Sequence, residues 1–110
     1  MYRRCAFFKG HVKPGHQAEF DTHIDTVLVD TWRAFPGAKE VRVLREVESD
    51  DPDAHFELII AIQFDSRDAI AAALASPERA DSRETSQYII DRFDGDLFHT
   101  VFRGNEFPHA

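Results

Sequence analysis

Residues 55–64 read His-Phe-Glu-Leu-Ile-Ile-Ala-Ile-Gln-Phe, and this stretch decides the fold. On one side of an extended chain every second residue would be large and apolar: Phe56, Leu58, Ile60, Ile62 and Phe64. The other side is apolar only in its middle, at Ile59 and Ala61, because Glu57 and Gln63 flank that pair. A strand with apolar residues on both sides is typical of the interior of a sheet. The stretch therefore predicts a central strand.

Outward from this strand, the hydropathy pattern predicts three more strands and two helical regions. The further strands are expected over residues 3–12, 38–48 and 97–103, the last of them after a turn at residues 93–96. Apolar residues at steps of three and four predict a helix of about five turns between Gly15 and Pro36. The second helical region is expected over residues 67–75 and 77–92. We expect a single domain over residues 1–104 and a tail over residues 105–110.

The order β-α-β-β-α-β predicts an α+β, ferredoxin-like sheet with helices on one face and strand order 4-1-3-2. The first and third strands, which that order places in the centre, are the ones with apolar residues on both sides. Two helical regions can cover only one face, so an apolar face would remain open for association. Because most soluble oligomers are closed twofold dimers, we expect a homodimer through the sheet face.

Composition argues against several classes of partner for this chain of 110 residues. The formal net charge is −7 and no stripe of Lys and Arg occurs, so binding to nucleic acid is not expected. The N-terminus lacks the apolar run of a signal peptide, and no stretch approaches the roughly 20 apolar residues of a membrane helix. We expect a cytoplasmic protein without a membrane partner. The single cysteine, Cys5, cannot form a disulfide within the chain.

Several short motifs carry a family resemblance: Lys13-Pro14-Gly15, His23 within the first helix, Phe35-Pro36-Gly37 and Ala75-Ser76-Pro77-Glu78. Together they resemble the EthD-type branch of the dimeric α+β barrel superfamily, over nearly the whole chain. In that family a Lys-Pro-Gly turn opens the first helix and an Ala-Ser-Pro-Glu stretch follows the second. The family's histidine is followed by Ala-Pro-Leu, where this chain has Ile24-Asp25-Thr26.

The resemblance implies a dimer whose two sheets form a barrel with a pocket for a small apolar oxygenated or aromatic compound. Relatives include cofactor-free isomerases and monooxygenases, haem-binding proteins and stress-responsive proteins. One hypothesis is therefore a cofactor-independent isomerase or monooxygenase, and no cofactor is expected. The alternative is a non-catalytic, stress-related ligand-binding or structural dimer, which the missing Ala-Pro-Leu favours.

His23 is the first catalytic candidate, because a histidine at the margin of the helix's apolar stripe can transfer a proton near neutral pH. The alternative is a boundary histidine bonded to a backbone carbonyl. Glu57 and His99 are further catalytic candidates, a carboxylate and an imidazole that strand parity can direct into one cavity. The alternative for these two is a polar network at the dimer seam.

The candidate ligand contacts are residues that strand parity can direct into the same barrel cavity: Arg42, Phe7, Ile59 and Gln63. No metal site is expected, because no two histidines stand at close ligand spacing. Cys5 lies in an apolar strand, where a free cysteine usually packs as a small hydrophobic residue.

Overall fold

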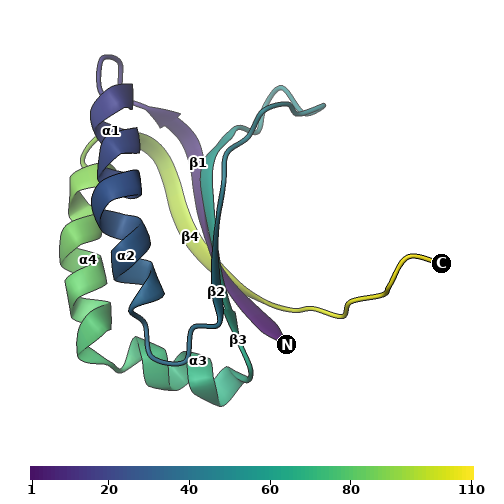
Figure 1. Cartoon of the computed structure of the whole chain (residues 1–110). Helices are drawn as coiled ribbons and strands as arrows, with labels where there is room; N and C mark the ends of the chain where they lie inside the picture. Colours follow the sequence, from purple (N-terminus) through teal and green to yellow (C-terminus); the bar gives the residue numbers. More distant parts are fainter.

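The computed structural model describes residues 1–110 and has four strands and a helical layer (Figure 1). The strands are β1 (Tyr2–Val12), β2 (Glu40–Leu44), β3 (Phe56–Phe64) and β4 (Phe93–Arg103). The helical elements are α1 (Gln17–His23), the π-helical turn η1 (Ile24–Leu28), α2 (Val29–Arg33), α3 (Arg67–Leu74) and α4 (Pro77–Ile90). The predicted β-α-β-β-α-β order is confirmed. None of the helices is both long and apolar enough to cross a bilayer.

The sheet is antiparallel throughout, with the order β2-β3-β1-β4, which is the predicted arrangement. All helices lie on one side of it (Figure 1). In the central pair, Phe8 of β1 lies opposite Leu58 of β3 on the helix-covered face. One residue earlier in β1, Phe7 lies opposite Ile59 on the other face. The two central strands therefore carry apolar side chains on both faces, as the sequence predicts.

The segment α1–η1–α2 buries one residue in every four: Phe20, Ile24, Leu28 and Trp32. In a regular α-helix four residues advance about 40° beyond a full turn, so such a row would rotate away from the sheet. The π-helical turn η1 closes i→i+5 hydrogen bonds and takes up more residues per turn. It thereby keeps the buried row aligned over the strands.

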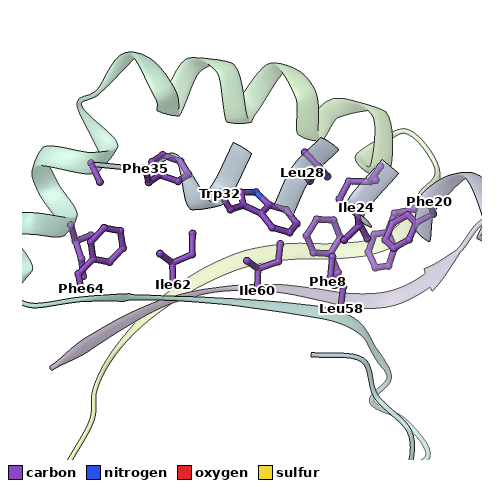
Figure 2. Close-up of a cluster of buried hydrophobic side chains, with 14 residues drawn as sticks. Phe8, Phe20, Ile24, Leu28, Trp32, Phe35, Leu58, Ile60, Ile62 and Phe64 are labelled. Atoms are coloured by element: carbon purple, nitrogen blue, oxygen red, sulfur yellow. The ribbon is translucent and has the colours of Figure 1, made fainter. Parts of the chain in front are cut away.

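Figure 2 shows this helical row facing a second row from the sheet, formed by Phe8 of β1 and the alternate residues of β3. Leu58, Ile60, Ile62 and Phe64 are the β3 members of that second row. Phe35, which follows α2, extends the helical row at the end nearest Phe64. The side of β3 that is apolar along its length is thus the one that carries the core.

Three expectations about the strands need correction. A β-bulge shifts the β1–β3 register, so Phe56 leaves the core side and its ring meets Phe7 on the open face at 5.7 Å. β4 begins at Phe93, where a turn was expected, because residues 93–96 stay paired with β1. β2 ends at Leu44, and residues 45–55 form a loop in place of the longer predicted strand.

The face of the sheet away from the helices, called the open face below, is covered by no other element of the chain (Figure 1). At its centre Phe7 stacks on Phe98 with ring centroids 5.1 Å apart, and Phe102 meets Phe7 edge-on at 6.2 Å. Phe98 and Phe102 remain 41% and 48% exposed. The predicted uncovered apolar face is therefore present.

Candidate functional site

A cavity of about 400 Å³ lies on the helix-covered face, between α4 and the strands β1, β3 and β4. Its apolar walls come from the sheet, from α2 and from the end of α4: Ala6, Phe8, Trp32, Phe35, Ile60, Ile62, Ile90 and Leu97. Small-molecule sites usually have volumes of roughly 300–1,000 Å³, apolar walls and a few polar groups. The size and the lining of this cavity meet that description.

The polar groups of the cavity come from two sources, the sheet and α4. From the sheet, Arg4 of β1 and His99 of β4 reach the helix-covered face, since His99 lies opposite Ala6 and Arg4 lies two residues before Ala6. From α4, the polar lining residues recur at helical spacing along one side: Arg79, Ser82, Arg83, Ser86 and Gln87. The cavity thus brings three guanidinium groups near one imidazole.

The titratable groups of the cavity shift one another's pKa values. Desolvation in the cavity and the positive charges of Arg4 and Arg79 together lower the pKa of His99 to about 4. Burial, followed by the charge of Arg79, lowers the pKa of Arg4 to about 10. At neutral pH His99 is therefore a neutral imidazole that can donate one hydrogen bond and accept another, while both arginines stay charged.

His23 lies outside this cavity, on the other side of α4. Its Nε2 donates a hydrogen bond to the backbone carbonyl of Thr85 at 2.8 Å, and its ring stacks on Tyr88 at 4.3 Å. This is the bond to a backbone carbonyl that the sequence offered as the alternative for His23. The catalytic role of His23 stays a prediction.

Glu57 is not among the cavity residues, so the structure does not bring it together with His99. It lies at the β-bulge, where its Oε2 is 3.2 Å from Nε2 of His55. Glu46 contacts the other ring nitrogen of His55, and the ring of His11 stacks on it at 4.5 Å. This polar network lies within one chain, whereas the alternative predicted for Glu57 is a network at the dimer seam. Both roles of Glu57 stay predictions.

The four predicted ligand contacts all lie on the open face, away from the cavity. Phe7 and Ile59 pair at its centre, and Arg42 lies opposite Ala61 and contacts Glu40. Gln63 accepts a hydrogen bond from Arg3 at 3.2 Å. Their predicted role requires a space between two facing sheets, and it stays a prediction.

The sequence of residues 1–85 matches the family described as antibiotic biosynthesis monooxygenase. The chain belongs to this family. The membership of the dimeric α+β barrel superfamily expected from the sequence motifs is thereby confirmed. A comparison with curated proteins gives no match.

Solved structures share the fold at low sequence identity. An EthD family protein from Bacillus halodurans has a TM-score of 0.73 and 21% identity, covering 97% of this chain and 99% of that one. An Arabidopsis thaliana protein gives 0.72 and 13%, with coverages of 99% and 100%. A Nitrosomonas europaea protein, provisionally named an antibiotic biosynthesis monooxygenase, gives 0.62 and 16%, with coverages of 94% and 98%. At these identities the likeness establishes the fold alone.

The sequence analysis did not identify the arginines that line the cavity of this protein. Arg4 precedes the apolar run Cys5–Phe8, and the pattern of that run indicates a strand without showing which face is hollow. The sequence does indicate a polar row on α4, because Arg79, Arg83 and Gln87 are spaced four residues apart and therefore lie on one side of the helix. No group of three or more His, Cys, Asp or Glu side chains is arranged to hold a metal ion.

Proposed function

We propose that the protein binds a small, largely apolar oxygenated ring compound in the cavity between α4 and the sheet, as a homodimer formed through the open face. The observation that carries the proposal is the cavity itself, which has about 400 Å³ of space, a mainly apolar wall and polar groups from both α4 and the sheet. Family members share a fold that serves many chemistries, so the proposal rests on this site and not on the fold.

In the catalytic form of the proposal, the protein transforms that compound without a cofactor, as an isomerase or a monooxygenase. His99 is the group best placed to act, because it is the imidazole that lines the cavity. A neutral imidazole can orient a substrate hydroxyl or carbonyl and can pass on a proton. The arginines beside it would stabilise negative charge that develops on a substrate oxygen.

The non-catalytic form of the proposal is a dimer that binds the same class of compound without changing it. Two observations support this alternative. His23, the candidate from the family motif, is engaged with Thr85 and lies outside the cavity. Glu57 and His55 pair with each other and not with a group in the cavity.

Binding can be measured through Trp32, the only tryptophan, because it lines the cavity. A panel of aromatic and lactone compounds should change its fluorescence, and a ligand at 100 times its dissociation constant should add about 2.7 kcal/mol of stability. If no compound of this class binds, the proposal fails.

The two forms are separated by incubating each bound compound with the protein in air and analysing it by NMR and oxygen uptake. For the catalytic form, His99→Ala should lower turnover by about 10²-fold or more, the usual size of an acid–base contribution. His23→Ala is the matched control and should keep its turnover. Loss in the His23 variant alone would move the role to His23, and a compound recovered unchanged would establish the non-catalytic form.

A further inference from the structure

The cavity has an unusual balance of charge for this chain. The formal net charge of the protein is −7, yet the residues that line the cavity include three arginines and neither Asp nor Glu. Most of the other arginines lie against carboxylates, as Arg45 does with Asp21 and Arg92 with Glu19. The positive cluster in the cavity therefore stands out against an acidic surface.

Arg4, Arg79 and Arg83 form no ion pair with any carboxylate of the chain. Arg4 and Arg79 are also half-buried, so part of their hydration is lost. A desolvated charge is normally compensated by an opposite charge, and like charges close together add to the cost. The mutual repulsion appears in the pKa of Arg4, which burial and Arg79 together lower to about 10.

The acidic residue next to Arg79 in the sequence does not supply this compensation. Glu78 lies in a separate, smaller hollow with Asp30 and Asp81, on another side of α4. One of its oxygens, Oε2, is buried there without a hydrogen-bond partner. The counter-charge for the arginines is thus absent from the chain itself.

We propose that the cavity selects a ring compound that carries a carboxylate, which Arg4 and Arg79 bind while the apolar walls hold the ring. This inference rests on the proposed function of the cavity and adds the charge of the ligand. A guanidinium is planar and presents paired N–H groups that match the two oxygens of a carboxylate. Arg83, which is exposed, lies where it can attract the anion to the cavity.

A set of three probes with the same apolar body tests the charge preference: adamantane-1-carboxylate, adamantane-1-methanol and 1-adamantanamine. None of them absorbs where Trp32 fluoresces, so fluorescence and calorimetry can be read side by side. We expect the carboxylate to bind at least tenfold more tightly than the alcohol, and the amine to bind most weakly. If the alcohol binds as tightly as the carboxylate, the charge inference fails while the cavity proposal stands. If none of the three binds, both fail.

Variants then test the residues. Arg79→Met keeps the length of the side chain and the helix propensity, and it should weaken carboxylate binding at least tenfold while changing alcohol binding less than twofold. Arg4→Gln should have the same selective effect. Arg67→Met is the matched control, because Arg67 is exposed on α3, unpaired and outside the cavity. Equal carboxylate affinity in the Arg79 and Arg67 variants would overturn the assignment.

His99 provides an independent readout that does not depend on affinity. A bound carboxylate would offset the positive charges of Arg4 and Arg79 that face the imidazole. An NMR titration should then show the pKa of His99 rising in the carboxylate complex, toward the ordinary value near 6.5, and staying low in the alcohol complex. An unchanged pKa in the carboxylate complex would place the anion away from the arginines and contradict the proposal.

Discussion

His55 lies between two carboxylates, and its charge is therefore linked to stability. The hydrogen bond to Glu57, opposed by partial desolvation and supported by Glu46, raises the pKa of His55 above its ordinary value. Because this pKa is raised, protonated His55 stabilises the folded protein. That contribution is fully present below the ordinary pKa near 6.5 and is lost as the pH rises through the pKa of His55 in the folded protein. The stacked ring of His11 is the other titratable group that faces it.

Replacing Glu57 by Gln should therefore lower the free energy of unfolding by about 1 kcal/mol at pH 5.5, the upper end of the range for solvent-accessible pairs, because this pair is partly buried. At pH 9 the loss should be smaller, since His55 is then neutral in both proteins. Urea unfolding at the two pH values measures the difference, and Glu48→Gln, in the neighbouring loop, is the control. An equal loss at both pH values would show that the pair does not titrate as described.

Strand parity predicted which residues share a side within each strand, but it did not predict which sides face one another across strands. Leu97, His99 and Val101 share the helix-covered face of β4, as their alternation indicates. Whether His99 joins Gln63 or Arg4 depends on the inter-strand register, and the pairing of His99 with Ala6 settles it in favour of Arg4. This is why the predicted catalytic group splits into separate clusters.

At the scale of elements, the first helical region was predicted as a regular helix, whereas it contains the π-helical turn η1. Its signature is present in the sequence as apolar residues spaced four apart, at Phe20, Ile24, Leu28 and Trp32. A regular helix favours alternating steps of three and four, so a run of fours indicates underwinding. The sequence alone does not distinguish this from a gradual rotation of the buried face, because packing against the sheet decides between them.

The start of β4 was not predicted correctly because Gly95 indicated a turn. In the structure, Gly95 instead allows β1 and β4 to approach each other closely. Gly95 and Gly10 lie opposite each other, with φ of 152° and 146°. A Cβ on Gly95 would lie 2.2 Å from the carbonyl oxygen of Lys9. The glycine pair therefore allows β1 and β4 to remain hydrogen-bonded through residues 93–96.

Gly95→Ala should accordingly destabilise the protein by about 3 kcal/mol or more, through both backbone strain and the clash. Gly15→Ala is the matched control, because its φ is 83° but nothing lies within 4 Å of its Cβ position. It should cost only the backbone term, about 1–2 kcal/mol. Chemical unfolding of both variants measures the difference, and equal losses would mean that the strands separate at Gly95 without cost.

At the scale of the whole molecule, the architecture was predicted from how much of the sheet the helices can cover. Two of the four strands are apolar on both sides, but the helical regions suffice to cover only one face of the sheet. That reasoning gave the strand order and the open face correctly. It also predicts ligand contacts between two facing sheets, at Phe7 and Ile59, and that role stays a prediction; it did not predict the cavity under α4. A cavity depends on how completely side chains fill the space between layers, and the hydropathy pattern does not report this.

The open face leads to the prediction for the assembly. Its aromatic cluster of Phe7, Phe56, Phe98 and Phe102 includes two exposed rings, Phe98 and Phe102, and an exposed apolar patch of this kind marks an association site. A stable dimer would bury about 1,200–2,000 Å² in total. Phe98→Lys would place an unpaired charge in that buried area, so we expect the dimer to weaken at least 100-fold, which is about 2.8 kcal/mol. Sedimentation at micromolar concentration should show a dimer for the unmodified protein and a monomer for this variant.

Leu74→Lys changes a similarly exposed residue on the helical side and should remain dimeric. An unmodified protein that sediments as a single subunit would remove the dimer, and the two-sheet barrel would have to be abandoned with it.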